Sequence, residues 1–517
     1  MAKTLTLTGS KLKPADVVML AQNPARSVAL APAALARVRT ARSFVEREAR
    51  RRIAYGINTG FGPMATKIID TGHLLALQEN LVRSHACGAG EPVPERVALG
   101  AMIARLNALL RGESGVSVEL VKRIAFYINH RIVPVIPEHG GVGASGDLIQ
   151  LAHVALALMG EGDVLWRGER RSAAAVLKRL RMAPYRLKEK EGLALINGTS
   201  YMTAAACFLV EDARRTLALS VRSAALALET AHAFSDALSP ALSRARPHVG
   251  QERIARALRA LTDGSRLLRS RRTFERSREV SAGELAYAAQ DVYSLRAVPQ
   301  ILGPALETLH ETERVVSTEL NATTDNPIVD VAGRAFVHGG NFHGEYVAAA
   351  ADNLKRALIK LAMLSERRLN YMLNAPLNGH FPPFLNLGTP GLTLALQGLQ
   401  FTATSTTARA QTLGYPHSLH SISSNGDNQD VVSMGADAVY FAQEAERHAR
   451  LVVALELTVL SQALACGNDG RALSPAGKRL LALVRGAVPP VIKDRPLANE
   501  LSRLMARLDE SDLDIVF

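Results

Sequence analysis

Residues 140–150, GGVGASGDLIQ, place the smallest side chains of the chain together, between two apolar segments. Small side chains pack little, and glycine loses the most backbone entropy on folding. One interpretation is a turn that leads into a helix, with Ser145 or Asp147 as its N-cap. The other is that the backbone of Ala144, Ser145 and Gly146 is itself the reactive group.

The second interpretation follows from simple chemistry. If a turn brings the Gly146 amide nitrogen onto the Ala144 carbonyl carbon, a five-membered ring can close. A side chain at position 146 would block that attack. Loss of water from the ring carbonyl and from Ser145 then leaves an exocyclic methylene. The standard side chains offer nucleophiles, acids and bases but no carbon electrophile, and this group would provide one.

Composition favours helices around this segment. Of the 517 residues 48% are hydrophobic and only 5% aromatic, and Ala, Leu and Arg, which are strong helix formers, are plentiful. After residue 200 the sequence predicts long helices over 200–238, 250–270, 281–324, 343–373, 390–412, 431–467 and 473–487. We therefore predict a mainly α protein with an N-terminal mixed domain, 1–200, which carries the reactive loop, and a bundle of long helices, 201–517.

The net charge of +13 raises the question of a nucleic-acid partner or a non-catalytic helical scaffold. The basic residues, however, occur in short bursts mixed with Glu, without a zinc-finger or RNA-binding pattern, so no nucleic-acid partner is expected. The three cysteines lie far apart, the N-terminus lacks a signal-peptide core, and no apolar stretch reaches membrane-spanning length. A cytoplasmic protein without a membrane segment is the expectation.

The longer string HGGVGASGDLIQLAH resembles the prosthetic-group segment of the aromatic amino acid ammonia-lyases and aminomutases. These enzymes make 4-methylideneimidazol-5-one from Ala-Ser-Gly, here Ala144, Ser145 and Gly146. Further strings resemble the family in the same order, over about residues 50 to 470: YGINTGFG, SHACGAG, LALINGTS, QDVYSLRAVPQILG, TDNP, GGNFHGE and NQDVVSMG.

The resemblance implies roles for individual residues. Tyr55 would be the base that removes the β-proton, Arg296 the bidentate clamp for the substrate carboxylate, and Asn197 the donor to the ring oxygen of the electrophile. From sequence alone, Asn197 could equally be a capping residue. Further positions that it places at the prosthetic group or substrate are Gln290, Tyr293, Asn326 and Phe342.

Two positions discriminate between substrates within the family. Histidine at 85 is typical of relatives that act on histidine or tyrosine, whereas histidine ammonia-lyases typically carry Glu where this chain has Gln429. The combination favours L-tyrosine and the product trans-4-hydroxycinnamate, with Tyr415 as a second partner for the phenol. Histidine ammonia-lyase, giving urocanate, and tyrosine 2,3-aminomutase remain alternatives.

The resemblance also implies a homotetramer whose active sites are shared between subunits, and no external cofactor. Metal chemistry is the competing idea, because His338 and His343 lie close in sequence, as do His417 and His420. No carboxylate or cysteine stands beside either pair to complete a set of ligands, so structural histidines and no metal are expected.

Overall fold

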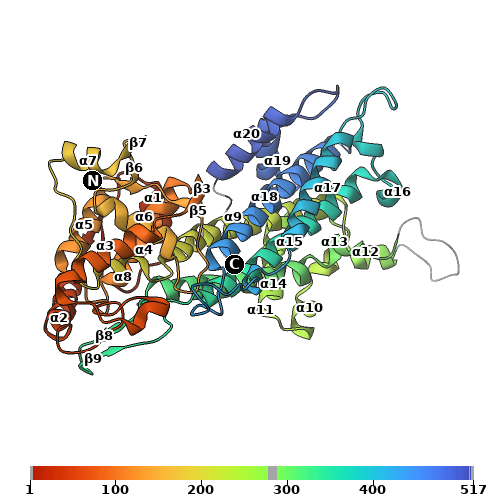
Figure 1. The fold of residues 1–517 in the computed structure, drawn as a ribbon. Helices are drawn as coiled ribbons and strands as arrows, with labels where there is room; N and C mark the ends of the chain where they lie inside the picture. The colour runs from red at the N-terminus through yellow and green to blue at the C-terminus, as the bar shows by residue number, and fades with distance from the viewer. Residues whose placement is uncertain (1–3, 277–287, 468, 512, 514–517) are drawn as a thin grey trace. The chain divides into compact units, whose positions relative to one another are not determined.

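The computed structural model describes residues 4–276, 288–467, 469–511 and 513. It is mainly helical (Figure 1), which confirms the predicted fold class. The predicted helix over 281–324 lies partly outside the described residues; its described part is α13 (Tyr293–Arg296) and α14 (Val298–Leu320). The other predicted long helices are present with ends shifted by up to eight residues.

The chain forms two compact units, and each is discontinuous in sequence. Unit 1 comprises Met1–Glu211, Glu311–Asp352 and Pro416–Phe441, and unit 2 comprises Asp212–His310, Asn353–Tyr415 and Ala442–Phe517. The expected division after residue 200 differs from this, since the chain returns to unit 1 twice. Four of the five boundaries lie inside long helices: α9 (Ser200–Thr230), α14, α15 (Glu345–Leu373) and α18 (Gly435–Cys466). The fifth, between Tyr415 and Pro416, lies in a loop.

Unit 1 holds the short strands and the helices of the first 200 residues. Its helices are α1 (Pro14–Gln22), α2 (Pro32–Glu48), α3 (Leu74–His85), α4 (Glu95–Leu109), α5 (Val118–Asn129), α6 (Leu148–Leu158), α7 (Ala173–Arg179) and α8 (Glu191–Ile196). Its strands are β1 (Thr4–Leu7), β2 (Ser27–Leu30), β3 (Ala89–Pro92), β4 (Val133–Pro134), β5 (Pro137–His139), β6 (Asp163–Trp166), β7 (Glu169–Ser172), β8 (Ile328–Asp330) and β9 (Ala335–Val337).

The strands of unit 1 form small sheets at the edges of its helices. β1 and β2 pair in parallel, with Thr4 opposite Ser27, and β3 pairs with β5, β6 with both β4 and β7, and β8 with β9, all antiparallel. The stretch GDVLWRGERRS, 162–172, forms the antiparallel hairpin β6–β7. Helix α4 is buried on nearly every side, so it is the central helix of this unit.

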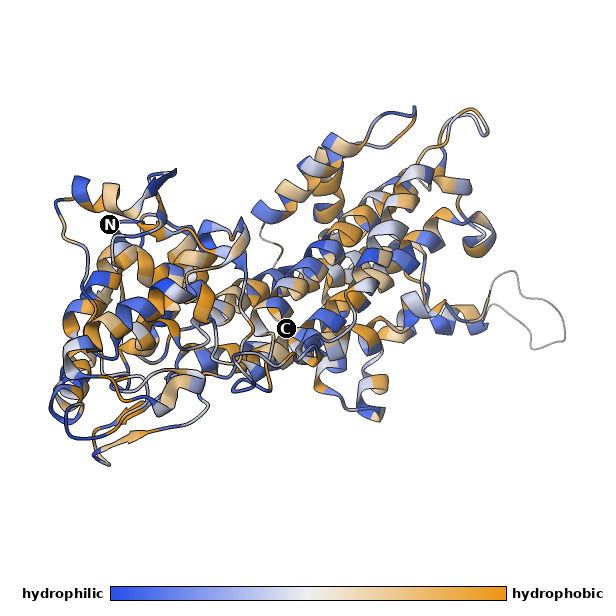
Figure 2. Ribbon diagram, viewed as in Figure 1, coloured by the Kyte–Doolittle hydropathy of each residue, from blue (hydrophilic) through white to orange (hydrophobic). Residues whose placement is uncertain are grey.

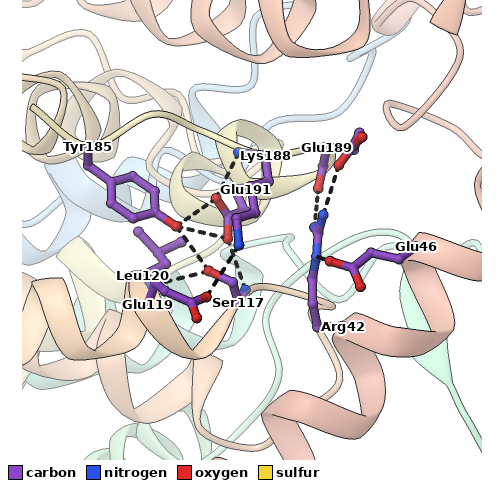
Figure 3. Close-up of polar contacts among 9 residues, drawn as sticks. All are labelled: Arg42, Glu46, Ser117, Glu119, Leu120, Tyr185, Lys188, Glu189 and Glu191. Carbon is purple, nitrogen blue, oxygen red and sulfur yellow. Dashed lines mark hydrogen bonds and ion pairs between the residues drawn. The ribbon is translucent and has the colours of Figure 1, made fainter.

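A buried polar network fixes the start of α8, the helix that ends just before Asn197 (Figure 3). The Glu191 carboxylate accepts the Ser117 N–H at 2.9 Å, the Lys188 N–H at 2.8 Å and the Tyr185 hydroxyl at 3.0 Å. Burial raises the pKa of Tyr185, which keeps the phenol protonated as a donor. Because Glu191 is fully buried and bonded on several sides, α8 begins at a defined place.

Unit 2 is built from helices. Besides its parts of the four long helices it holds α10 (Pro240–Ala245), α11 (Val249–Thr262), α12 (Arg271–Arg276), α13, α16 (Ala375–Asn378), α17 (Gln397–Thr412), α19 (Pro475–Ala487) and α20 (Ala498–Glu510). Figure 2 shows hydrophobic and hydrophilic residues mixed along the long helices, as expected when one face is buried. By length and composition α18 could span a membrane, but 78% of the qualifying window is buried inside the protein, which is typical of a core helix.

Candidate active site

A cavity of about 810 Å³ in unit 1 brings together motifs that are far apart in sequence. Its volume lies in the range of small-molecule sites. Nine of the predicted site residues line it: Tyr55, His85, Ala144, Ser145, Gly146, Asn197, Asn326, Phe342 and Gln429.

The Ala-Ser-Gly segment lies against the backbone that follows α8. Gly146 and Gly198 form an isolated β-bridge: the Gly198 N–H donates to the Ser145 carbonyl at 3.2 Å, and the Asp147 N–H donates to the Gly198 carbonyl at 2.8 Å. A Cβ at Gly146 would lie 2.2 Å from the Gly198 carbonyl carbon, and φ at Gly146 is +70°. Glycine is therefore required at 146 both for the turn and for this close approach.

The residues before Ala144 are held from the opposite direction. The Gly143 carbonyl accepts the Gly344 N–H at 3.0 Å and the Ser433 hydroxyl at 3.1 Å, and the Val142 carbonyl accepts the Met434 N–H at 2.9 Å. The turn is thus fixed on both sides before any covalent change, which fits a segment that must bend onto itself.

Asp147 stands at the N-cap position of α6, but its side chain caps another helix. The carboxylate accepts the N–H groups of Tyr201 and Met202 at 2.7 and 3.0 Å, which are free donors in the first turn of α9. No side-chain bond to α6 is present. Burial raises the pKa of Asp147 to about 7. Asp147 therefore caps a helix as predicted, but it caps α9 instead of α6.

Asn197 lies at the cavity with its side chain directed elsewhere than expected. Its amide Nδ2 donates to the Asn326 carbonyl at 3.2 Å, and its Oδ1 is buried without a hydrogen bond to any described residue. The donor to the Ser145 carbonyl, which would become the ring oxygen, is the Gly198 backbone. The role given to Asn197 stays a prediction, and the sequence does not predict the Gly198 backbone as a donor to this carbonyl.

The buried side chain of Arg105 holds the loop that contains Asn197. Arg105 of α4 is 1% exposed and donates to the carbonyls of Ala194, Asn197 and Thr324, the last two at 2.8 and 3.3 Å. Burial lowers the pKa of Arg105. Beside it Lys190 and Asp325, both fully buried, form an ion pair at 2.9 Å. Nothing local in the sequence marks these three residues as part of one network.

Tyr55 lies in a loop that is anchored on both sides. Its neighbours Ala54 and Ile57 belong to a buried apolar cluster with Phe44 and Val329. The Gly62 N–H donates to the Tyr55 phenol oxygen at 2.9 Å, which places a backbone donor at the atom expected to take the proton. A phenol held in this way cannot swing freely, and it lines the cavity.

The fully buried Gln78 ties this loop to α8. Its amide donates to the Gly56 carbonyl at 2.9 Å and accepts the Leu193 N–H at 3.0 Å. Because α8 leads into Asn197, one side chain relates the tyrosine loop to the asparagine loop.

His85 ends α3 and lines the cavity. Its Nδ1 lies 2.9 Å from the Leu81 carbonyl and 3.0 Å from the Ser84 hydroxyl, and the tautomer with its proton on Nδ1 can donate to that carbonyl. The other ring nitrogen, Nε2, is then a hydrogen-bond acceptor.

Gln429 contacts the reactive segment directly. Its amide Nε2 donates to the Ser145 hydroxyl at 3.0 Å. Position 429 is predicted to contact the substrate ring, and the sequence does not predict its bond to Ser145.

The remaining predicted residues, Gln290, Tyr293, Arg296 and Tyr415, belong to unit 2. The Arg296 guanidinium lies over the Tyr293 ring at 4.5 Å from its centroid. Arg296 Nε is buried without an acceptor among the described residues, and Tyr293 is 69% exposed. The Tyr415 carbonyl accepts the Lys355 ammonium at 2.9 Å. Together these residues present an aromatic face and an unsatisfied guanidinium donor.

A second cavity in unit 1, of about 710 Å³, is lined by residues of α2, β8 and the end of α4. Its two arginines are committed to the protein, since Arg37 donates to Thr8 and Leu110 carbonyls and Arg111 to the Asn321 carbonyl. None of the predicted site residues lines it. The motif-lined cavity is therefore the candidate active site.

Comparison with known proteins identifies the family of the chain. The sequence profile of the family described as aromatic amino acid lyase matches residues 12–486. Histidine ammonia-lyase of Caldanaerobacter subterraneus is 38% identical over 97% of this chain and 95% of its own length. Tyrosine ammonia-lyase of Cupriavidus metallidurans is 39% identical over 98% and 96%.

A mutase is equally similar. Tyrosine 2,3-aminomutase of Chondromyces crocatus is 39% identical over 95% of this chain and 94% of its own. Among solved structures, tyrosine aminomutase from Streptomyces globisporus superposes with a TM-score of 0.94 at 35% identity, covering 99% of this chain and 98% of that one. Because the match extends over nearly the whole of both chains, and the motifs meet in one cavity, the chain belongs to the aromatic amino acid lyase family.

Proposed function

We propose that this protein removes ammonia from L-tyrosine without oxidation, giving trans-4-hydroxycinnamate. The observation that carries the proposal is the environment of Ser145: a turn fixed on both sides, a backbone donor on its carbonyl, and a phenol in the same cavity. The residues fit a 4-methylideneimidazol-5-one formed from Ala144, Ser145 and Gly146 with loss of two waters. Once formed, this group supplies an electrophilic carbon toward the substrate's amino group.

Three further groups have separate roles in the proposed reaction. The Gly198 N–H stabilises negative charge on the Ser145 carbonyl oxygen, as backbone donors do in oxyanion sites. Tyr55 takes the proton from the β-carbon, and its phenol oxygen is oriented by the Gly62 N–H. Loss of that proton and of ammonia gives the unsaturated acid. Arg296 pairs with the substrate carboxylate, for which its unsatisfied Nε is suited.

Tyrosine is favoured by two residues of the cavity. A phenol hydroxyl is a donor, and His85 Nε2 is an acceptor when Nδ1 donates to the Leu81 carbonyl. Gln429 is neutral, so it brings no carboxylate to an imidazole. Its bond to the Ser145 hydroxyl belongs to the chain before that hydroxyl is lost as water. The relatives named above act on histidine or tyrosine according to their names, at equal identity, so the cavity rather than the identity supports the choice.

We further propose a homotetramer with shared sites. Arg296, Tyr293 and Gln290 belong to unit 2, whereas the cavity is lined by unit 1. A second copy of the chain would supply the carboxylate clamp to each cavity.

The test is incubation of the full-length protein with L-tyrosine, L-phenylalanine and L-histidine in separate reactions. The expected product is hydroxycinnamate from tyrosine, and Ser145→Ala should abolish it while the circular dichroism spectrum is unchanged. Urocanate from histidine, or a β-amino acid from tyrosine, would replace the proposal with lyase activity on histidine or with mutase activity. Undiminished activity of Ser145→Ala would contradict the assigned role of Ser145.

A further inference from the structure

Three metal-ligating side chains of unit 2 converge outside the candidate active site. His232, His380 and Asp469 each present a ligand atom, and these atoms lie within 4.8 Å of one another. They come from three separate segments: His232 follows α9, His380 follows α16 and Asp469 follows α18. The sequence gives no hint of this cluster, because its members are at least 89 positions apart.

The separation of the two closest ligand atoms fits a common ion. His232 Nε2 lies 3.2 Å from Asp469 Oδ2. Ligands bound to zinc at about 2.0–2.2 Å in tetrahedral geometry are separated by roughly 3.3–3.6 Å. The pair therefore needs little movement. The rings of His232 and His380 are inclined at 66° with centroids 5.1 Å apart, so they do not stack face to face. His380 is exposed, and a change of rotamer can bring its nitrogen closer.

The backbone around each ligand is already held. His232 has a left-handed φ of +50°, and its N–H donates to the Glu229 carbonyl at 3.1 Å. The Asn378 side chain accepts the His380 N–H at 2.8 Å, and the Asp469 carbonyl accepts the Ala472 N–H at 2.9 Å. The left-handed His232 ends α9 in a C-cap motif, since the Ala233 N–H also donates to the Leu228 carbonyl at 2.9 Å.

The pair His417 and His420 in unit 1 offers an instructive contrast. Folding does bring a carboxylate near it, since Asp437 Oδ2 lies 3.6 Å from His417 Nε2. However, His417 directs its other nitrogen, Nδ1, toward His420 at 3.2 Å. The two contacts use opposite sides of one ring, so the three groups do not surround a common point. This group serves as a control for histidine content.

We propose that His232, His380 and Asp469 bind one divalent transition-metal ion, with Zn²⁺ as the best fit to two imidazoles and one carboxylate. Water completes the tetrahedron. Because the ligands come from three segments, the ion ties the ends of α9 and α18 to the α16 loop and stabilises unit 2. The inference rests on this geometry alone and is independent of the proposed reaction.

The test uses the full-length protein, stripped with chelator and dialysed against micromolar free Zn²⁺. We expect about one more zinc bound per chain in the wild type than in His232→Ala or His380→Ala. His420→Ala should bind as the wild type does. Co²⁺ should give a visible tetrahedral absorption band in the wild type and in His420→Ala, but not in His380→Ala. Zn²⁺ should also raise the wild-type Tm.

His380 is exposed, so His380→Ala keeps the test valid even where His232→Ala fails to fold. Equal zinc stoichiometry in the wild type and His380→Ala would overturn the proposal and leave a His232–Asp469 ion pair alone. An equal loss of zinc in His420→Ala would overturn it as well, because binding would then follow histidine content rather than this cluster.

Discussion

The cavity of unit 1 and the α13 segment of unit 2 are predicted to serve one substrate, yet they are built in opposite ways. Around the cavity three side chains are bonded inside the protein: Asp147 to α9, Gln78 to two loops and Arg105 to three carbonyls. Asn197 Oδ1 and the second Asp147 oxygen have no partner among the described residues. In α13, by contrast, Tyr293 is exposed and Arg296 Nε has no acceptor among the described residues. The proposed reactive segment is thus held within one chain, whereas the proposed carboxylate clamp, Arg296, has an Nε without an acceptor in the described part of the chain.

The largest effect is expected from removing Arg105, the buried cation next to the cavity. Arg105→Met would leave the carbonyls of Ala194 and Asn197 without a donor and the charge of Asp325 less balanced. Breaking a buried charged network costs about 3–5 kcal/mol. We expect loss of essentially all activity and failure to lose the mass of two waters at Ala144–Gly146, read by mass spectrometry of the digested protein.

Arg105→Lys is the matched control, because it keeps the charge but not the fork of donors. It should mature and turn over at an intermediate level. If Arg105→Met still lost two waters at Ala144–Gly146 and kept its activity, the loop at Ala194–Asn197 would be held without this residue. The claim that the buried network around the cavity positions the reactive segment would then be wrong.

The second prediction concerns Arg296 of unit 2. Arg296→Met removes the carboxylate clamp, and loss of one partner of a desolvated charged pair costs about 2–5 kcal/mol. We expect kcat/KM to fall by about 10²- to 10³-fold, mainly through KM. The mass change at Ser145 should be unaffected, since Arg296 belongs to unit 2. A maturation defect would instead make Arg296 part of the cavity's own support.

Mixing two variants tests whether Tyr55 and Arg296 of one active site come from different chains. When Tyr55→Phe and Arg296→Met chains are dissociated and reassembled together, about a quarter of shared sites should regain both residues by random exchange. The assay uses tyrosine far below the raised KM of Arg296→Met, where both parent variants have little activity. Activity near that fraction of the wild type is expected. A mixture that stays inactive, with reassembly confirmed by light scattering, would place both residues in one chain's site.

The contrast also explains what the sequence could and could not predict. The reactive segment was predictable because its chemistry lies in three consecutive residues, and nine predicted residues do line one cavity. The Arg105 network was not, because its acceptors lie 89 to 219 positions away and a buried arginine looks like any helical one. Asp147 caps a helix 54 residues onward, which depends on tertiary packing. The sequence does not predict the discontinuity of either unit for the same reason, since four of the five boundaries lie inside continuous helices.

A smaller effect is expected from Gln429→Glu, which tests substrate choice within the organised cavity. The change replaces the donor to Ser145 Oγ by a carboxylate that can bind an imidazole. Hydrogen bonds to charged groups are worth about 1.5–3 kcal/mol, so the ratio of kcat/KM for histidine over tyrosine should rise about 10- to 100-fold. Gln429→Met is the control without charge. An unchanged ratio, with normal maturation, would remove position 429 from the argument for tyrosine.

The smallest effect concerns the charge of Asp147. Its pKa is raised from 3.8 to about 7 by burial. Between these values the unfolded chain releases the proton while the folded chain keeps it, so the free energy of unfolding falls as pH rises and the loss is complete above about pH 7. The loss is at most about 4 kcal/mol. Ionisation of Asp147 should therefore lower the wild-type Tm at pH 8 by several degrees, in addition to any effect of the other titratable groups.

Asp147→Asn separates capping from charge, because an amide oxygen still accepts the N–H groups of Tyr201 and Met202 but cannot ionise. We expect the difference in Tm between pH 5 and pH 8, measured by calorimetry, to shrink in this variant, whereas the exposed control Glu169→Gln keeps the wild-type difference. An unchanged pH dependence in Asp147→Asn would mean that the carboxyl is ionised in the folded protein at pH 5. The organised side of the cavity would then hold a buried negative charge next to the segment that must close its ring.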